Sequence, residues 1–466
     1  MPDLSTIISK ALSLCEPSHS DETRIAKVAQ ESKAHVERYV AHMDDVVEVV
    51  FGGSFAKGTW LPKHADIDIF VKIAPSVGIE RFEKMGIEIG SNALKKYGPK
   101  LRYSDHPYVE VFVRKVRVNV VPCFDVKQGN WQSAADRSPF HTEYISSLFD
   151  NEKRRQTRIL KKFFKSVGIY GAEISTEGFS GYVSEVLILK YSSFENVLRS
   201  VADWQERQII AVSDYDSDMV KTFSSPLIII DPVDSRRNLG TAISAESVAK
   251  LMLAARSFLE EPSVEFFKEV DKRYRYIASK QQQLLLPNVL IVEFSHRRKS
   301  PDIIWGQLKR SVNAVSRQLE LANFKVLRSS CLTDEKSSAV FAFLLESITL
   351  PAYTKKKGPE VFRRKDTASF LSNRKSKPLG IWVDEEMRIA MVVERKATDA
   401  RKFVKSLLFE YGEKNTNNSS SISSGVSKDL IKSGLQIYSG SDRKKIKGLA
   451  KEVISEVVST ERFIFK

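Results

Sequence analysis

The chain has 466 residues, of which 42% are hydrophobic and 28% charged, and this length predicts two to four globular domains. It has no run of about 18 apolar residues, no signal-peptide pattern, and three cysteines without a CxxC pair. These features argue against a membrane protein, a disulfide framework and a cysteine zinc site, and they favour a reducing, cytoplasmic location. The net charge of +15 arises beyond residue 150, since residues 1–150 contain 19 Lys and Arg against 20 Asp and Glu. A basic body that binds a polyanion is therefore expected, with a solvated lysine-rich surface as the alternative.

Hydrophobic periodicity predicts a mixed α/β first part followed by helices. One or two helices are expected within residues 6–44, and further helices at 79–97, 152–168 and 178–191. Short β-branched strands are predicted at 46–53, 67–73, 108–113 and 116–121. The last two strands form a hairpin around Arg114 and Lys115, and Pro122 ends the second of them.

The pattern of the second half of the chain predicts an α+β fold. Helical patterns recur at 243–260 and 302–322, whereas the apolar residues 284–294 and 338–346 fit either a strand or a helix. Residues 381–396 alternate like a hairpin and lead into a helix from about residue 399. The polar segment 413–427, which is rich in Ser and Asn, predicts a flexible loop.

The strongest chemical signal is the segment FGGSFAKGTWLPKHADIDIFVKI (51–73). Gly53 lets the backbone come close to a ligand, and Ser54 opens a short helix. The helix N-terminus and the Ser54 hydroxyl are expected to hold phosphates. Lys57 lies one helical turn further along, where its ammonium can reach the same phosphates.

The same segment ends in a pair of carboxylates on a strand. Asp66 and Asp68 are residues i and i+2, so both point to one side of the sheet while Ile67 points into the core. Two such carboxylates can bridge Mg²⁺ ions that also bind a triphosphate and a hydroxyl nucleophile. An acidic pair or a glycine turn alone is a weak signal, but the two together at this spacing predict a nucleotidyl-transfer site.

With this motif the chain resembles the nucleotidyltransferases related to polymerase β, and among them the archaeal-type (class I) CCA-adding enzymes. Five further segments match that family's pattern in order, namely SAADRSPFH (133–141), LKKFFKSVGIYGAE (160–173), GFSGYVSEVLI (178–188), DPVDSRRN (231–238) and FLEEPSVEFF (258–267). The resemblance is clear over about residues 1–270 and looser beyond. The RRD-type motif of the bacterial and eukaryotic class is not seen after the head.

The resemblance implies an α+β multidomain fold. It implies a polymerase β-like nucleotidyltransferase head with a mixed sheet at 1–150, a helical central nucleotide- and RNA-binding domain at 151–256, and an α+β tRNA-binding body and tail at 257–466. It further implies addition of C, C and A to the 3′ end of tRNA from CTP and ATP, with two Mg²⁺ ions and release of pyrophosphate. The implied partner is the acceptor stem and 3′ end of tRNA, and the oligomeric state stays open, with a homodimer as one alternative.

Individual roles follow from the resemblance position by position. Asp66 and Asp68 would bind the metal ions, and Gly53, Ser54 and Lys57 would hold the triphosphate. Positions that contact the phosphates and sugar of the incoming nucleotide are matched by Arg137, His141, Lys161 and Tyr170. A segment that helps to choose between CTP and ATP is matched by Arg236 or Arg237 together with Asn238, and His106 lies close to the catalytic strands.

The residues themselves allow simpler interpretations for three of these positions. Lys161 lies on a basic helix, where it can be merely solvated. Tyr170 lies between two glycines, Gly168 and Gly171, and is either exposed for stacking or an ordinary buried tyrosine. His141 follows Pro139 and Phe140 and can simply cap a helix.

One position departs from the family's pattern. The family expects a third carboxylate on the strand VRVNVVPC (116–123), and the aligned residue is Asn119, which can ligate a metal through its carbonyl oxygen but carries no charge. If the hairpin turns between Arg114 and Lys115, Glu110 faces Asn119 and can place a carboxylate near that position. The hypothesis is that Glu110 supplies the missing charge. The alternatives are a crippled site or an enzyme that tolerates the amide.

The C-terminal half contributes basic clusters that suit phosphate contacts, although each can equally be a solvated face. They lie at 355–365, 374–378 and 442–448, and GPEVFRRKD resembles the family's segment that grips the acceptor stem. Two rival functions remain open at this point. One is another enzyme on the same head, such as a poly(A) polymerase or oligonucleotide synthetase, and the other is a tRNA-binding protein with a degenerate catalytic site.

Overall fold

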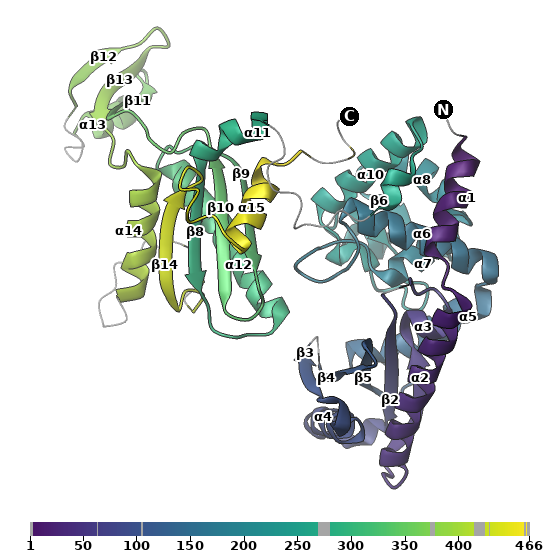
Figure 1. Ribbon diagram of the computed structural model, residues 1–466. Helices are drawn as coiled ribbons and strands as arrows, with labels where there is room; N and C mark the ends of the chain where they lie inside the picture. Colours follow the sequence, from purple (N-terminus) through teal and green to yellow (C-terminus); the bar gives the residue numbers. More distant parts are fainter. Residues whose placement is uncertain are drawn as a thin grey trace. The chain divides into compact units, whose positions relative to one another are not determined.

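The computed structural model describes residues 3–62, 64–103, 106–268, 280–372, 378–413, 425–427, 429–460 and 463. The chain divides into two compact units, one formed by residues 1–270 with 460–466 and the other by residues 271–459 (Figure 1). The first unit contains both the predicted head and the predicted central domain. Most of the predicted loop at 413–427 lies outside the described residues, as does most of the basic cluster at 374–378.

The head is built on a five-stranded sheet in the order β1-β2-β5-β4-β3. Its strands are β1 (Val46–Gly52), β2 (Asp66–Ile73), β3 (Lys100–Tyr103), β4 (Pro107–Val113) and β5 (Val116–Phe124). β2 and β5 run parallel, whereas the other neighbouring pairs are antiparallel. The sheet is therefore mixed, as the resemblance implied.

One face of this sheet is apolar and covered by helices. α2 (His19–Val40) and α4 (Ile79–Ala93) pack against the alternate β-branched residues of β2, β4 and β5, such as Ile67, Val111 and Val118. Because side chains alternate along a strand, the residues between them point to the opposite face. That second face carries the acidic pair of β2.

The first helical segment consists of two helices, α1 (Leu4–Cys15) and α2, in agreement with the prediction of one or two. Two details of the head differ from the sequence-based predictions. α4 ends at Ala93 before a short 3-10 turn at Lys95–Tyr97. The prediction that Pro122 ends the second hairpin strand is wrong, since β5 continues to Phe124. The pairing with β4 stops at Val120, so no neighbour on that side needs an amide hydrogen from Pro122.

The central part of the first unit is mainly helical around an aromatic core. Its helices are α5 (Arg137–Leu148), α6 (Asn151–Val167), α7 (Gly181–Tyr191), α8 (Phe194–Ala202), α9 (Ser217–Lys221) and α10 (Ala245–Glu260), with two short strands, β6 (Gln208–Ile210) and β7 (Leu227–Ile229). Phe163, Phe194 and Phe258 pack together with Phe266 and Phe267 of a 3-10 turn at Val264–Phe267. These last two rings explain why the compact unit extends past residue 256, where the sequence suggested a boundary.

The second unit contains a four-stranded sheet in the order β14-β8-β10-β9. Its elements are β8 (Val289–Ser295), β9 (Val326–Thr333), β10 (Ser338–Leu345), β14 (Ser433–Ser439), α11 (Lys280–Leu285), α12 (Pro301–Leu321), α14 (Ala400–Glu413) and α15 (Leu449–Val458). α12 and α14 share a core with one face of the sheet, and α15 shares a core with the other. The two apolar segments that the sequence left ambiguous are thus central strands buried on both faces, which removes the alternation that identifies a strand.

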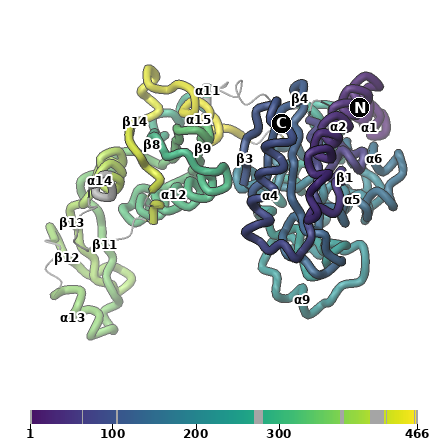
Figure 2. The backbone as a smooth tube through the Cα atoms, turned by 90° about the horizontal axis from the view of Figure 1, so that it is seen from below, coloured from purple at the N-terminus to yellow at the C-terminus, as the bar shows by residue number. Residues whose placement is uncertain are grey.

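A small three-stranded sheet completes the second unit. It has the order β11-β13-β12 and consists of β11 (Tyr353–Glu360), β12 (Gly380–Val383) and β13 (Arg388–Glu394), with α13 (Arg364–Ser372) beside it. In two views at right angles it stands off from the four-stranded sheet beyond α14 (Figures 1 and 2). Among the helices that the structure describes, none is both long and apolar enough to cross a membrane.

Candidate active site

The glycine turn brings the backbone against the acidic strand. Gly53 begins the short helix α3 (Gly53–Lys57) with φ of +65°, and a Cβ at this position would lie 2.0 Å from Oδ2 of Asp68. No side chain larger than hydrogen fits there without moving the carboxylate, and the backbone angle itself favours glycine. The glycine turn and the acidic pair of the sequence motif are therefore in direct contact.

The two carboxylates lie on the open face of the sheet with one partner each on β5. Arg117 donates from Nε to Oδ1 of Asp66 at 2.9 Å and from a second nitrogen to Oδ2. Asn119 donates from Nδ2 to Oδ1 of Asp68 at 2.8 Å. Burial raises the pKa of Asp68 above its ordinary value, although the hydrogen bond from Asn119 opposes that shift. A partly buried carboxylate of this kind is stabilised in its ionised form by a cation that approaches it.

The amide of Asn119 is only half satisfied. Its Oδ1 atom is buried and has no hydrogen-bond partner, which is costly for a polar atom unless a ligand supplies the missing contact. Within the described ranges, no three His, Cys, Asp or Glu side chains form a group that could hold a metal ion. The groups described on this face that could ligate a metal ion are the carboxylates of Asp66 and Asp68 and the amide oxygen of Asn119.

The predicted hairpin register is confirmed. Glu110 lies opposite Asn119 and Val113 opposite Val116. Arg114 and Lys115 both adopt positive φ, at 48° and 67°, which is the geometry of a two-residue hairpin turn. The carboxylate of Glu110 is nevertheless occupied, because Arg102 of β3 donates to its Oε1 from two nitrogens, at 2.8 and 3.1 Å.

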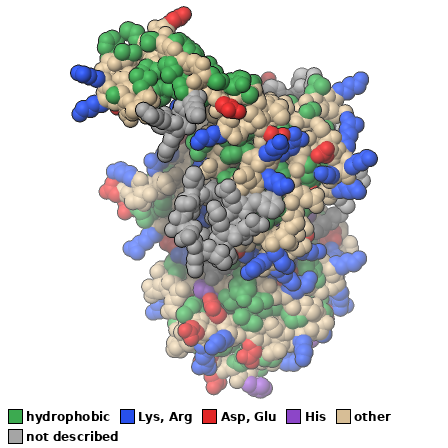
Figure 3. All heavy atoms as spheres, turned by 90° about the vertical axis from the view of Figure 1, so that its left-hand side faces the viewer, with side chains coloured by type: hydrophobic (Ala, Val, Ile, Leu, Met, Phe, Trp, Pro, Cys, Tyr) green, Lys and Arg blue, Asp and Glu red, His purple; other side chains and the backbone are tan. Residues whose placement is uncertain are grey.

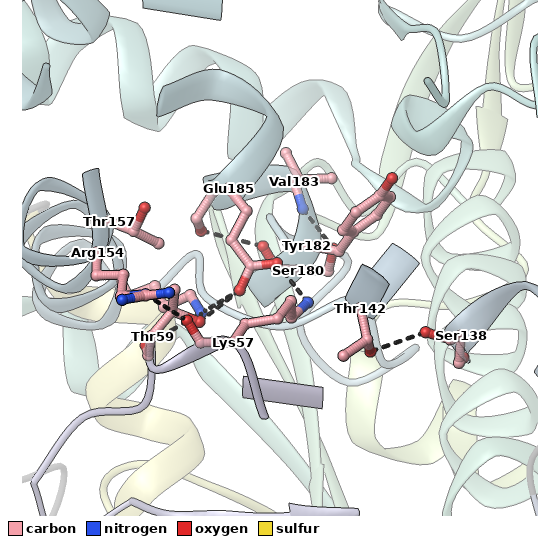
Figure 4. Close-up of polar contacts among 12 residues, drawn as sticks. Lys57, Thr59, Ser138, Thr142, Arg154, Thr157, Ser180, Tyr182, Val183 and Glu185 are labelled. Carbon is pink, nitrogen blue, oxygen red and sulfur yellow. Dashed lines mark hydrogen bonds and ion pairs between the residues drawn. The ribbon is translucent and has the colours of Figure 1, made fainter. Parts of the chain in front are cut away.

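Lys57 and Lys161 meet at one buried carboxylate, that of Glu185, which Figure 4 shows together with Lys57 and Thr59. Glu185 of α7 is fully buried and accepts from Lys57, from Lys161 at 3.0 Å and from the Thr59 hydroxyl at 2.5 Å. The two ammonium groups outweigh the effect of burial and lower the pKa of Glu185 to about 2. The interpretation of Lys161 as a solvated side chain is wrong, since only 1% of the residue is exposed.

This cluster, formed by Lys57, Thr59, Lys161 and Glu185, joins the head to the central helices. Two arginines of α6 strengthen the junction, because Arg154 donates to the carbonyl of Lys57 at 3.2 Å and Arg158 to the carbonyl of Gly58 at 2.7 Å. α6 and α7 thereby hold the C-terminal end of α3 in place. A buried ionic contact thus holds the short helix that follows the glycine turn.

His141 belongs to a second buried network. Its ring stacks on Tyr182 with centroids 3.9 Å apart, and its Nε2 lies 2.9 Å from Oδ2 of Asp231. Tyr182 also donates to Asp231, at 3.2 Å, and burial lowers the pKa of His141 below its ordinary value. The interpretation of His141 as a helix cap is wrong, because α5 begins at Arg137 and His141 lies within the helix.

A cleft of about 1290 Å³ opens between the head and the central helices of the first unit. Five of the residues that the resemblance singled out line it, namely Arg137, His141, Arg236, Arg237 and Asn238. Aromatic rings and polar groups complete the lining, chiefly Trp131, Tyr182, Phe223, Gln128 and Asp234. Arg137 lies over the ring of Trp131, 5.2 Å from its centroid, and donates to Asp234 at 2.8 Å. Cationic and flat aromatic side chains thus face one space.

Tyr170 and His106 lie outside this lining, whereas the side chain of Asn238 supports the backbone beside the cleft. Tyr170 packs against the central core with the Lys165 ammonium 4.9 Å from its ring. His106 contacts Glu83 of α4 at 3.0 Å and the ring of Phe82. Asn238 accepts from the amides of Ile229 and Gly240, so its side chain shapes the turn beside the cleft.

Several site residues were missed by the sequence reasoning. Glu185 carried a signal, since it is the only charge among the apolar residues 183–189 of a predicted buried helix. Arg117 carried no such signal, because its contact with Asp66, 51 positions away in the sequence, depends on β2 and β5 being neighbours in the sheet. Trp131, Tyr182 and Asp231 meet only through the folding of the central helices onto the head.

Comparisons with known proteins agree with this arrangement. Family profiles match the chain as a nucleotidyltransferase domain at residues 34–144, a tRNA nucleotidyltransferase second domain at 155–268, and a CCA-adding enzyme C-terminal domain at 287–438. The CCA-adding enzyme of Saccharolobus shibatae is 35% identical over 401 residues, which cover 86% of this chain and 91% of that protein. The chain belongs to the CCA-adding enzyme family. The enzyme of Pyrobaculum islandicum is likewise 35% identical, over 78% of this chain and 84% of its own.

Solved structures overlap less of the molecule. A structure of CdnC from E. coli MS115-1 with ATP covers 57% of this chain and 95% of its own, at 19% identity and a TM-score of 0.44. The family assignment rests on the sequence comparisons. As a member of that family, the chain is a nucleotidyltransferase of tRNA processing.

Replacing Gly53 with alanine is expected to lower the rate of nucleotide addition by roughly 10²-fold, because the new Cβ must displace the carboxylate of Asp68 and misplacement by about 1 Å has such an effect. Gly98→Ala is the matched control, since Gly98 also has a positive φ, of 66°, but nothing lies within 4 Å of its Cβ position. Steady-state rates with CTP distinguish the two variants. Equal losses in both would show that backbone strain, rather than contact with Asp68, limits position 53.

Proposed function

We propose that the chain adds C, C and A to the 3′ end of tRNA from CTP and ATP, with release of pyrophosphate. The observation that carries the proposal is the acidic pair, Asp66 and Asp68, on an open sheet face beside the unpartnered amide oxygen of Asn119. In a member of the CCA-adding family, this face is the natural place for the RNA 3′-hydroxyl and the α-phosphate to meet. Positioning and charge neutralisation then supply most of the catalysis.

The residues of this face fit two Mg²⁺ ions. Carboxylate and amide oxygens are ligands that Mg²⁺ prefers, and Asn119 Oδ1 lacks any other partner. Asp66 and Asp68 would hold both ions, and Asn119 would complete the ligand set. When bound, the ions would neutralise phosphate charge and lower the pKa of the attacking hydroxyl. Gly53 keeps the backbone close to Asp68, so that the carboxylate stays oriented toward the site.

The cleft suits the nucleotide. Trp131 and Tyr182 offer flat rings, and Arg137 and Arg237 offer guanidinium groups to phosphate or sugar oxygens. Arg137 and Arg237 are held by Asp234 and Asp231, so they are oriented before a ligand binds. Ser54 would approach the triphosphate from the head, together with the end of the Lys57 side chain once it turns from Glu185. Lys161 and Tyr170 would act by supporting this side of the site from within the core.

The second unit suits the tRNA. Its small sheet and the turn after β11 present exposed apolar side chains, among them Phe362, Ile381, Trp382 and Val383. Hydrophobic side chains gather at the top of Figure 3. Lys355 lies over the ring of Trp382 in β12, and Lys356 lies over the ring of Phe370 in α13. Duplex RNA is recognised mainly through its backbone and shape, so cations supported by apolar surface fit an acceptor stem.

Glu110 remains the proposed source of the missing third charge. It lies opposite Asn119, and its release from Arg102 would let the Glu110 carboxylate approach the amide of Asn119. Glu110→Gln is then expected to lower CTP incorporation by about tenfold or more, whereas Asn119→Asp should maintain or raise it. Unchanged incorporation by Glu110→Gln would leave the two aspartates and Asn119 as the complete ligand set.

The test of the function is the choice of nucleotide at each step. With tRNA that lacks the 3′ CCA, CTP alone should add two residues and ATP alone none, while tRNA ending in CC should accept a single A. An open-ended run from ATP would identify a poly(A)-polymerase-like enzyme.

The second candidate is a tRNA-binding protein with a degenerate site, which the neutral Asn119 and the pairing of Asp66 with Arg117 favour. It predicts bound tRNA that is never lengthened unless Asn119 is changed to Asp.

A further inference from the structure

The first of the two expected metal ligands already has a cation beside it. Strands β2 and β5 run parallel with Asp66 opposite Arg117 and Asp68 opposite Asn119, so all four side chains lie on the open face. Arg117 reaches both oxygens of Asp66 with two of its nitrogens, which is a bidentate pair. The carboxylate that should receive a divalent ion is therefore engaged by a guanidinium.

This arginine changes the charge of the face. Asp66, Asp68 and Arg117 together leave a single net negative charge, and Asn119 adds none. Glu110, which lies opposite Asn119, is neutralised by Arg102 at 2.8 Å. Divalent cations bind more tightly to sites whose ligands carry more negative charge, and a guanidinium on the same carboxylate repels them. The chain without substrate thus lacks much of the charge that tight divalent binding needs.

The ion pair is also placed where it can open. The side chains of Arg117 and Asp66 are 45% and 33% exposed, and ion pairs at this exposure contribute little to stability because water screens them. A nucleoside triphosphate brings several negative charges to the same face. Its phosphate oxygens offer a guanidinium the bidentate contact that it makes with a carboxylate.

We propose that Arg117 is a resident counter-ion of Asp66 that weakens divalent binding to the free enzyme and yields when a nucleoside triphosphate arrives. The inference rests on the proposed function, because it assigns the substrate that releases the arginine. It makes occupancy of the metal site depend on the nucleotide. Asp66 then receives the divalent ion as Arg117 turns to the phosphates.

Binding of Mn²⁺ alone to the full chain, without nucleotide or RNA, tests this device through the electron paramagnetic resonance signal of the free ion. Arg117→Met keeps the apolar stem and removes the charge, and it is expected to bind Mn²⁺ roughly five- to tenfold more tightly than the native chain. Arg117→Lys keeps the charge and should bind close to the native value. Arg114→Met is the matched control, because Arg114 lies on the same hairpin and pairs with Glu31 at 2.9 Å. A non-hydrolysable CTP analogue should tighten Mn²⁺ binding in the native chain and much less in Arg117→Met.

Equal or weaker Mn²⁺ binding by Arg117→Met, with thermal unfolding showing a folded variant, would overturn the proposal. Tighter binding that persists after Asp66→Asn is added would overturn it too, because the ion would then be bound elsewhere. Should Arg117→Met not fold, Arg117→Gln replaces it in the same comparison. These binding constants are measured without RNA, so a chain that fails to lengthen tRNA would refute the proposed function without changing them.

Discussion

Replacing Asp68 with asparagine is expected to reduce nucleotide addition by roughly 10²- to 10⁴-fold, since metal-assisted charge stabilisation is worth several kcal/mol and about 1.4 kcal/mol corresponds to tenfold in rate. The same substitution should leave the fold at least as stable as that of the native chain. Burial raises the pKa of Asp68, so at neutral pH its ionised form opposes folding. The amide removes that charge and still offers an oxygen to Asn119. Single-turnover rates with CTP and urea unfolding measure the two effects on one preparation.

Asp125→Asn is the control for this variant. Asp125 follows the end of β5, and its carboxylate lies 3.8 Å from the Lys72 ammonium, at 41% exposure and away from the glycine turn. Its replacement should change neither the rate nor the stability by more than a small amount. A loss of activity in Asp68→Asn that merely followed a loss of folded protein would argue that Asp68 has a structural role instead.

Replacing Glu185 with glutamine should destabilise the chain by about 3–5 kcal/mol, because it leaves the ammonium groups of Lys57 and Lys161 buried without their common carboxylate. Glu185 is fully ionised at neutral pH, given that the two lysines lower its pKa to about 2. Its carboxylate therefore cannot be replaced by an amide without cost. Urea unfolding followed by tryptophan fluorescence gives the free energy of unfolding, and Trp60, Trp131 and Trp204 report on the first unit.

Two further variants separate the buried cluster from a general effect of charge. Glu195→Gln removes an exposed carboxylate that pairs with Arg199 at 2.7 Å, and it should change stability by less than about 0.5 kcal/mol. Adding Lys161→Met to Glu185→Gln removes one of the two stranded charges and should recover part of the loss. An unchanged stability in Glu185→Gln would contradict the account of this junction.

Much of the head could be predicted because its strands and turn are determined by residues that are close together in the sequence. Alternation placed Asp66 and Asp68 on one face, and the two residues between the hairpin strands fixed Glu110 opposite Asn119. The prediction that a proline ends a strand failed at Pro122, since it treated the residue as if both sides of the strand were paired. Whether an amide hydrogen is needed depends on how far β4 extends, which is a property of the sheet and not of the segment.

The partners of the candidate site could not be predicted, because they come from segments far apart in the chain. Lys57 and Lys161 looked like phosphate ligands or solvated cations, and the structure places both on Glu185. The burial of Lys161 can be understood only once α6 is packed against the head and α7. The contact of Arg117 with Asp66 likewise depends on the parallel pairing of β2 with β5.

The most direct measurement is the length of tRNA lacking its 3′ CCA after incubation with CTP, ATP and Mg²⁺ and either the native chain or Asp68→Asn. The account predicts that the native chain lengthens the RNA by C, C and A and then stops, and that Asp68→Asn leaves it at its original length over the same time. Bound but unlengthened tRNA with the native chain would contradict the account, and so would full addition by Asp68→Asn.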